Sequence, residues 1–371
     1  MTHRKLRVGV VFGGRSREHE VSLQSSSFVM AHLDREKYEV VPIGITRTGA
    51  WLPGVEPAQF LAAEKTEQKS AHAEHTTALA PAGDSGTRDL LPLQSGEQIE
   101  GAPLDVIFPA LHGPYGEDGT IQGLLEMADL PYVGCGVLGA ALGMDKEKMK
   151  VLFRAAGLPV LDGYTFKRKE WERSPETIID TIEQRFGYPC VVKPVNLGSS
   201  IGVTRVDERD ALVQAIKLAA ECDSKIIVER GLNIRELSCS VLGNDEPQVS
   251  YVGELVTKET LLDYDAKYVN HGYHVVAPAE IPQSLSEDLR RMSIQAFQAL
   301  DLNGLARVDF FLDRDSGKIY LNEVNTMPGF TDTSIYANVW QATGLSYEQL
   351  FDRLIELALE RHEDRRRSDQ M

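Results

Sequence analysis

Residues 304–329 read GLARVDFFLDRDSGKIYLNEVNTMPG, with two runs of alternating side chains on either side of a polar segment, 313–317. The alternation predicts two strands, and the Asp, Ser and Gly residues between them predict a tight turn. Because successive side chains of a strand point to opposite faces, every second residue shares a face. On paired strands, four polar side chains would therefore gather: Arg307, Asp309, Glu323 and Asn325.

Two carboxylates and an amide oxygen in this position point to a hard cation. Burying a carboxylate without a partner costs several kcal/mol or more. Mg²⁺ takes oxygen ligands and often shares them with substrate phosphates. Two such ions about 3.5–4 Å apart would clamp a transferring phosphoryl group. The alternative is a solvated sheet edge where Asp309 and Glu323 face water, and the alternation alone leaves it open.

Composition narrows the class of protein. A chain of 371 residues predicts two or three domains, and 42% hydrophobic with 25% charged residues is typical of a globular protein. The net charge of −16 argues against a nucleic-acid or anionic-membrane partner. Four scattered cysteines indicate core residues in a reducing compartment. With neither a signal sequence nor an apolar run of ~20 residues, we expect a cytoplasmic protein.

The N-terminal part predicts a strand–helix–strand unit. A compact apolar run at 6–12 ends in two glycines, helical sequence covers 21–30, and a second strand is expected at 39–45. This order predicts a doubly wound α/β domain. Glu18 follows the first strand, where such sheets bind ligands. Its position alone favours a carboxylate that interacts with the helix dipole.

Between residues 62 and 156, one segment has no expected role, and one residue, His112, is a possible ligand contact. Residues 62–103 are rich in small and polar residues, and we expect a loop-rich excursion. A strand is expected at 105–111, followed by a glycine-rich loop. His112 in that loop is either a ligand contact or a hydrogen-bonded loop histidine. Residues 134–139 match GxGxxG, but helical sequence follows at 138–156, so we do not expect a dinucleotide site.

The middle of the chain predicts a phosphate site. Lys146 lies on the polar face of a predicted helix, where a lysine either reaches a phosphate or is solvated. Lys193 lies inside an apolar strand, so it must snorkel or meet an anion. A loop with Gly198, Ser199 and Ser200 follows, and its backbone N–H groups can cradle phosphate oxygens. A plain hairpin turn is the alternative.

The last third supplies a junction, a lid and a helix start. The backbone N–H and C=O groups of an extended segment near Glu229 could form hydrogen bonds with the edge of an adenine base. Glu236 could then bind the ribose. Polar and aromatic residues at 258–271 predict a mobile lid. Ser334 begins a helix whose dipole suits a carboxylate. The tail, 362–371, is expected to fray.

The order of these features resembles the ATP-grasp superfamily, and five motifs are similar to the D-alanine–D-alanine ligase family. They are GGRSREHEVS (13–22), LHGPYGEDG (111–119), KPVNLGSS (193–200), DYDAKY (263–268) and NTMPGF (325–330). The resemblance runs nearly end to end. It implies an α/β and α+β protein: a doubly wound N-terminal domain (1–140), then the two ATP-grasp subdomains (141–228 and 229–371).

The resemblance implies a role for each motif residue. Those that would bind ATP are Lys146, Lys193, Ser199, Glu229, Glu236 and Lys267. Those that would hold two Mg²⁺, or Mn²⁺, are Asp309, Glu323 and Asn325. Those that would serve the D-alanines are Glu18 with His112 at the first ammonium, Arg307 with Gly329 as the oxyanion site, and Ser334 at the second carboxylate. Ser199 and Tyr268 would link flap and lid to Glu18.

The implied reaction is ligation of two D-alanines through an acylphosphate, for peptidoglycan precursors, by a homodimer. D-alanyl-D-lactate ligase or another ATP-grasp ligase is the alternative, and a catalytically silent nucleotide-binding module is a rival of another class. Relatives that make the depsipeptide lack the tyrosine matching Tyr268, so Tyr268 favours the dipeptide. The lid departs from the family at Leu261-Leu262, where an aromatic pair is common, which leaves lid packing open.

Overall fold

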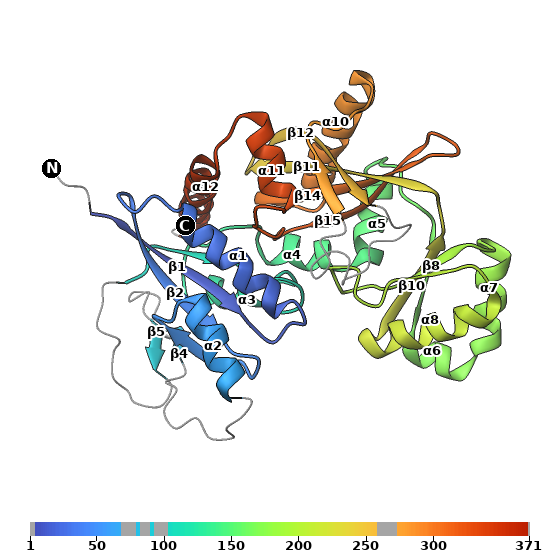
Figure 1. Ribbon diagram of the computed structural model, residues 1–371, viewed down its shortest axis with the longest axis horizontal. Coiled ribbons are helices and arrows are strands. Elements are labelled where there is room, and N and C mark those ends of the chain that lie inside the picture. The colour runs from blue at the N-terminus through green and yellow to red at the C-terminus, as the bar shows by residue number, and fades with distance from the viewer. Residues whose placement is uncertain (1–3, 68–78, 82–89, 93–102, 258–272, 370–371) are drawn as a thin grey trace.

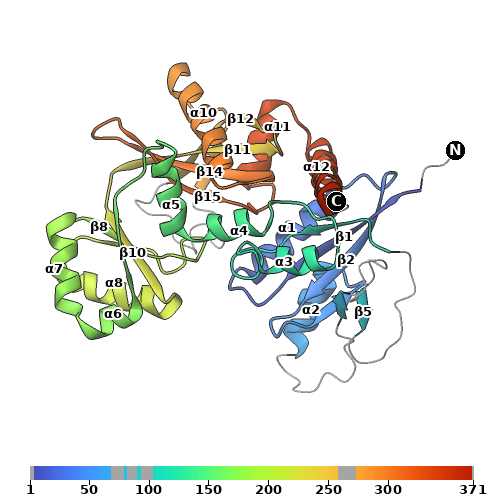
Figure 2. The same cartoon turned by 180° about the vertical axis from the view of Figure 1, so that it is seen from behind.

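The computed structural model describes residues 4–67, 79–81, 90–92, 103–257 and 273–369, and three sheets organise these residues (Figures 1 and 2). The sheet nearest the N-terminus has the order β3-β2-β1-β6, and β1 runs parallel to both β2 and β6. This confirms the strand–helix–strand unit. Its elements are β1 (Leu6–Gly13), α1 (His19–His32), β2 (Tyr38–Ile45), β3 (Trp51–Pro53), α2 (Pro57–Glu67), β6 (Val106–Pro109) and α3 (Thr120–Met127).

The predicted excursion begins inside a helix, because α2 continues to Glu67. Two short paired strands, β4 (Leu79–Pro81) and β5 (Leu90–Pro92), are the described part of the rest.

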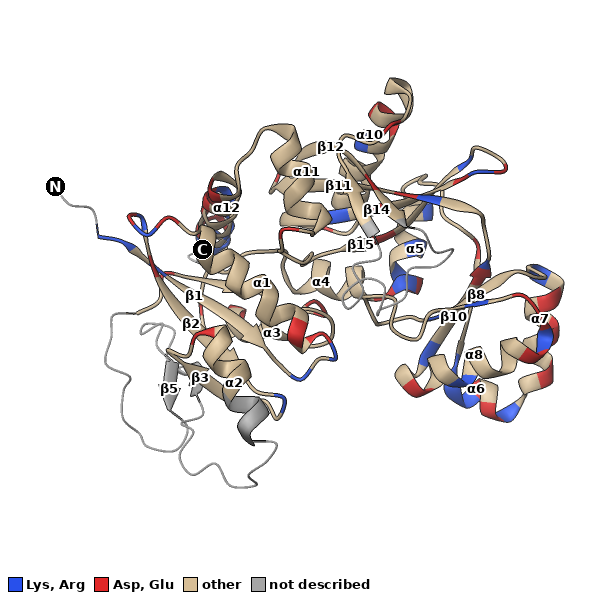
Figure 3. Ribbon diagram, in the orientation of Figure 1, with Lys and Arg blue, Asp and Glu red and all other residues tan. Residues whose placement is uncertain are grey.

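The second sheet forms a separate lobe with its own apolar core. Its order is β7-β10-β8-β9, and every pair is antiparallel. The helices of this lobe bury apolar faces against the sheet and carry charges of both signs outside (Figure 3). The elements are β7 (Gly163–Lys167), α6 (Arg168–Arg173), α7 (Pro175–Arg185), β8 (Cys190–Pro194), β9 (Thr204–Val206), α8 (Arg209–Cys222) and β10 (Lys225–Arg230).

The third sheet contains the predicted hairpin. Its order is β13-β12-β11-β14-β15, and the strands β14 and β15 pair antiparallel with Arg307 opposite Asn325 and Asp309 opposite Glu323. The hairpin is therefore confirmed, in the register that brings the polar side chains together. The elements are β11 (Ile234–Gly243), β12 (Gln248–Thr257), β13 (Tyr273–Val276), α10 (Gln283–Ala299), β14 (Gly304–Asp313), β15 (Ile319–Asn325) and α11 (Ile335–Thr343).

Two short helices, α4 (Val137–Met144) and α5 (Lys146–Ala155), replace the continuous helix predicted at 138–156. Asp145 causes the break, because it leaves helical geometry and accepts hydrogen bonds from the backbone N–H groups of Glu147 and Lys148. Both helices pack into the core of the third sheet. Gly139 in the GxGxxG match lies where a Cβ would be 2.9 Å from the Asp301 carbonyl, so close packing explains this glycine.

The last helix, α12 (Tyr347–Asp369), corrects the prediction of a frayed tail. Arg361 donates hydrogen bonds to the carbonyls of Tyr132 and Gly134, and Arg365 pairs with Glu126 at the end of α3. These polar contacts hold a segment that has no apolar pattern. Upstream, α12 packs on α1 and β6, so the two ends of the chain share one core (Figure 1). Within the described ranges, every helix is too short or too polar to cross a membrane.

Candidate active site

One cleft opens where the three sheets meet, and every described residue predicted to act lines it. Lys267, Tyr268 and the Leu261-Leu262 pair lie outside the described residues. The predicted residues that the structure brings together in the cleft are Glu18, His112, Lys146, Lys193, Ser199, Glu229, Glu236, Arg307, Asp309, Glu323, Asn325, Gly329 and Ser334. They come from segments more than 300 residues apart in the chain.

Asp309 is the centre of the hairpin's polar face. Arg307 forms a bidentate pair with it: Nε donates to Oδ1 at 2.8 Å, and Nη2 donates to Oδ2 at 2.7 Å. Asn325 donates from its amide to Oδ2 at 2.9 Å, and Ser238 donates to Oδ1 at 2.7 Å. A bidentate arginine pair fixes the plane of a carboxylate. The solvated-edge alternative is wrong for Asp309, because its carboxylate is held by three neighbours inside the cleft.

The donor set fits a hard divalent cation. Asp309 and Glu323 supply carboxylate oxygens, and the amide of Asn325 has an oxygen at the end opposite the N–H group that binds Asp309. These are the oxygen ligands that Mg²⁺ and Mn²⁺ take in proteins. Lys146 lies 3.2 Å from Glu323, so a cationic side chain balances part of the negative charge.

The loop that contains Gly198, Ser199 and Ser200, called the flap below, places Ser199 beside Glu18. Ser199 and Ser200 have positive φ values of 52° and 56°, a conformation that L residues adopt only when the surroundings hold it. Ser199 donates a hydrogen bond to Glu18, across 181 residues of sequence. Lys146, at the start of α5, donates to the carbonyl of Leu197 at 2.8 Å. The flap is therefore fixed to both neighbouring segments.

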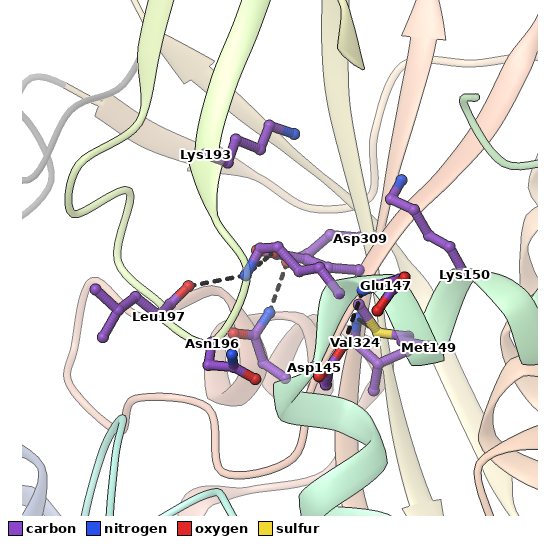
Figure 4. A network of polar contacts seen from close by, with 12 residues as sticks. Asp145, Glu147, Met149, Lys150, Lys193, Asn196, Leu197, Asp309 and Val324 are labelled. Carbon is purple, nitrogen blue, oxygen red and sulfur yellow. Dashed lines mark hydrogen bonds and ion pairs between the residues drawn. The ribbon is translucent and has the colours of Figure 1, made fainter. Parts of the chain in front are cut away.

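Glu229 lies between two lysines at the base of the cleft (Figure 4 shows the lysines). Its side chain is 1% exposed, with Lys150 at 2.7 Å from Oε1 and Lys193 at 2.6 Å from Oε2. Burial disfavours the charged carboxylate, yet the two ammonium groups overcome it and lower the pKa of Glu229 to about 2. Burial lowers the pKa of Lys150, whereas Glu229 raises that of Lys193 against its burial. Sequence reasoning identified Glu229 and Lys193 and missed Lys150.

An apolar slot lies beside these charges. Leucine, isoleucine, valine and phenylalanine side chains form it, and the Lys193 ammonium lies 5.5 Å from the centroid of the Phe311 ring. A flat heteroaromatic ring would fit such walls. The slot comprises six of the cleft's apolar lining residues: Leu161, Val191, Leu232, Ile234, Leu255 and Phe311.

Three buried groups from the N-terminal part hold the loop after β15. His112 pairs through Nδ1 with the Met327 carbonyl at 3.0 Å and through Nε2 with Ser25 at 2.8 Å. Ser25 also accepts from the N–H group of Phe330 at 3.1 Å. Burial lowers the pKa of His112 to about 4, so the imidazole is neutral at pH 7. The open choice for His112 is resolved in part: it is a hydrogen-bonded loop histidine that also lines the cleft.

Glu117 is the third of these groups, and sequence reasoning missed it. Its Oε1 accepts from the Met327 N–H at 3.0 Å and its Oε2 from the Gly113 N–H at 2.7 Å. Burial and the neighbouring Glu18 raise the pKa of Glu117 to about 8. The signal was present, because Glu117 lies within a motif, but the sequence alone does not separate it from the half-buried Asp118 beside it.

Gly329 and Ser334 line the same cleft as Glu18. A Cβ on Gly329 would lie 3.3 Å from the Ser334 hydroxyl, so the glycine allows a close approach. Ser334 precedes α11 as its N-cap but makes no side-chain capping bond to that helix. Its hydroxyl instead accepts from the Thr331 N–H at 3.0 Å. The serine is thus held at a dipole-positive helix end, which favours an anion.

Comparison with known proteins gives a consistent result over nearly the whole chain. Residues 7–135 match the family model described as D-ala D-ala ligase N-terminus, and residues 152–356 match D-ala D-ala ligase C-terminus. A D-alanine–D-alanine ligase of Natranaerobius thermophilus is 45% identical over 98% of both chains, and one of Ruminiclostridium cellulolyticum is 47% identical over 98% of both.

Solved structures agree with the sequence relatives. The D-alanine-D-alanine ligase from Coxiella burnetii superposes with a TM-score of 0.82 at 32% identity and covers 99% of this chain and 98% of its own. VanG D-Ala:D-Ser ligase from Enterococcus faecalis gives 0.82 at 38% identity, with 96% and 100% covered.

Proposed function

The chain belongs to the D-alanine–D-alanine ligase family and is an ATP-dependent ligase, and from this premise we propose how its cleft joins two D-alanine molecules. Glu18 receives the ammonium of the first D-alanine, with His112 nearby. Ser334 holds the carboxylate of the second. Both subsites line the same cleft as Arg307, which supports a reaction between their occupants beside this arginine.

ATP lies along the lysine side of the cleft. The apolar slot takes adenine, with Glu229 at the base and Glu236 at the ribose. Lys146 and Lys193 contact the phosphates, and Lys267 approaches the γ-phosphate from the lid. The positions of Lys146 and Lys193 in the lining of the cleft support this arrangement.

Asp309, Glu323 and Asn325 would hold two Mg²⁺ ions, and Mn²⁺ has the same donor preference. The bound ions would neutralise charge on the transferring phosphoryl group.

In the first step, a carboxylate oxygen of the first D-alanine attacks the γ-phosphorus of ATP, the bond to the β-phosphate oxygen breaks, and ADP leaves. Lys146 and Lys193 offset negative charge on the phosphates. In the second step, the neutral amine of the second D-alanine attacks the acyl carbon. Arg307 and the Gly329 N–H stabilise the tetrahedral oxyanion, and phosphate leaves as the peptide bond forms.

Water must be kept from the acylphosphate, because hydrolysis would waste it. The hydrogen bond from Ser199 to Glu18 supports a closing role for the flap. Tyr268 would add a link from the lid to Glu18, as the family resemblance implies. The single observation that carries the assignment is this meeting of Glu18 and the flap in one cleft with the Arg307–Asp309 pair.

The test is phosphate release from ATP and Mg²⁺ with product masses. D-alanine alone should release phosphate and yield the dipeptide, and L-alanine should not. Release that depends on added D-lactate or D-serine would assign a different second substrate; the D-serine arm is included because VanG is similar in structure. No release in any arm would contradict the ligase assignment.

Three further parts of the proposal concern context. The dipeptide supplies peptidoglycan precursors, the protein works in the cytoplasm, and two copies form a homodimer. Light scattering on the purified chain checks the last point, because a dimer has twice the mass of the 41.1 kDa chain. A single species at the monomer mass would contradict it.

A further inference from the structure

Lys150 is a buried charge that the proposed reaction does not use. It projects from α5, its side chain is 3% exposed, and its ammonium lies 2.7 Å from Glu229. Glu229 and Lys193 line the cleft, whereas Lys150 is not among the lining residues. Lys150 therefore approaches Glu229 from behind, on the side away from any ligand (Figure 4 shows Lys150 and Lys193 reaching from α5 and β8).

Lys150 lies on the buried face of α5, where the packing of the helix alone would favour an apolar residue. Its neighbours Met149 and Phe153 on α5 are fully buried apolar residues, and Lys148 on the same helix is exposed. An apolar side chain of similar volume at position 150 would often be at least as stable as a buried ion pair. The lysine thus calls for a role beyond stabilising the fold.

Charge balance suggests the role. One carboxylate is shared by two lysines, and Lys193 is also attracted by Glu323 and Glu236. Lys150 holds Oε1 of Glu229, so Lys193 need not hold the carboxylate alone. Without Lys150, the Glu229 carboxylate could rotate about its last bonds, and Lys193 would be drawn further from the cleft.

We infer that Lys150 is a positioning residue for the nucleotide: it fixes the Glu229 carboxylate so that an oxygen accepts a hydrogen bond from the 6-amino group of adenine. This inference rests on the proposed placement of adenine in the apolar slot. It predicts that Lys150 governs the choice between ATP and a purine nucleotide that lacks the 6-amino donor, although Lys150 touches neither.

Binding of Mg-ATP and of Mg-inosine triphosphate to the whole chain, measured by calorimetry, tests the inference without turnover. Inosine triphosphate has an acceptor oxygen in place of the amino donor. The unaltered protein should prefer ATP. Lys150→Met should weaken ATP binding by about 10–100-fold, by analogy with the loss of metal affinity when the partner behind a metal ligand is removed. Inosine triphosphate binding should change much less, so the preference falls.

The control is Lys148→Met, the same substitution at an exposed lysine of the same helix, which should leave both affinities unchanged. Lys150→Arg keeps the charge and should restore most of the preference. If Lys150→Met does not fold, Lys150→Gln against Lys150→Arg serves the same comparison.

Equal loss of both affinities in Lys150→Met would show a merely structural role and overturn the inference. An unaltered protein that binds both nucleotides equally would overturn it too. Failure of the proposed ligase activity gives a different result, because phosphate release would be absent while the preference for ATP, and its dependence on Lys150, would persist.

Discussion

Among single residues, Glu117 and His112 connect the N-terminal part of the chain to the loop after β15. Both bind the backbone of Met327, which lies two residues before Gly329. A side chain of the N-terminal part thus fixes a loop that follows β15. Because these hydrogen-bonded groups are buried, the loop is already ordered in the absence of substrate. Substrate binding therefore costs little further conformational freedom in this loop.

His112 should make stability depend on pH. Its pKa falls from 6.5 to about 4 on folding, so the unfolded chain binds the proton first as the pH drops. The contribution is present above pH 6.5 and is lost as the pH falls toward 4. Between pH 7 and pH 5 it should amount to about 2 kcal/mol. Urea unfolding of His112→Asn should therefore show a smaller loss of stability over this interval; an equal loss would contradict the burial argument.

Tyr268→Phe should raise the use of D-lactate relative to D-alanine. The variant loses the phenol hydroxyl that would bridge the lid to Glu18 and Ser199, and with it part of the selection for the second substrate. Competition between D-alanine and D-lactate, with products separated by mass, measures the ratio. Tyr251→Phe, at an exposed tyrosine of β12, is the matched control. An unchanged product ratio would remove Tyr268 from the choice of substrate.

At the scale of elements, α5 links the site to the lobe of the second sheet. Asp145 caps α5 and lies 2.5 Å from Lys225, which begins β10. The helix carries both Lys146 and Lys150. Its first turn therefore sets where two ammonium groups lie relative to Glu323 and Glu229.

Asp145→Ala should destabilise the protein by about 1 kcal/mol through loss of the cap. It should also raise the KM for ATP more than the KM for D-alanine, because the lysines of α5 serve the nucleotide. Urea unfolding and steady-state kinetics measure the two effects. Asp145→Asn keeps the capping oxygen and loses the charge, so it should recover most of the stability. Equal changes in both KM values would argue for a general loss of structure.

Elements with a strong pattern could be predicted from the sequence, and those held by distant contacts could not. Alternation located the hairpin of β14 and β15 and the polar face that meets at Asp309. The break at Asp145 was missed because an aspartate within helical sequence is more often solvated than a cap. The length of α12 was missed because Arg361 binds carbonyls, and Arg365 a carboxylate, more than 200 residues away.

The same limit applies within the site. Lys150 is one of three lysines in the run KEKMK, and its burial depends on Glu229 from another lobe. Residues such as Lys193 could be identified because an apolar strand surrounds them. Lys150, in contrast, is on a helix with other lysines close by in the sequence, so its neighbours do not mark it as buried.

For the whole molecule, α12 ties the N-terminal sheet to the rest. Arg361 binds two carbonyls and stacks 4.1 Å from the Tyr132 ring centroid. Arg361→Ala should destabilise by about 1–3 kcal/mol, because it leaves buried acceptors without a donor. The thermal midpoint should fall by several degrees while the KM for ATP stays unchanged, since Arg361 is outside the cleft. Arg367→Ala, at an exposed arginine of α12, is the control; an equal fall there would contradict the account.

The shared core of the two chain ends has a consequence during protein synthesis. Phe351 and Leu354 of α12 pack against Val10 and Phe108, which leave the ribosome more than 200 residues earlier. At about 5–20 residues per second, the nascent N-terminal sheet waits on the order of ten seconds or more for the helix that covers it. Its apolar face is exposed throughout that interval. We therefore expect the nascent chain to bind chaperones that cover exposed apolar surface until translation ends.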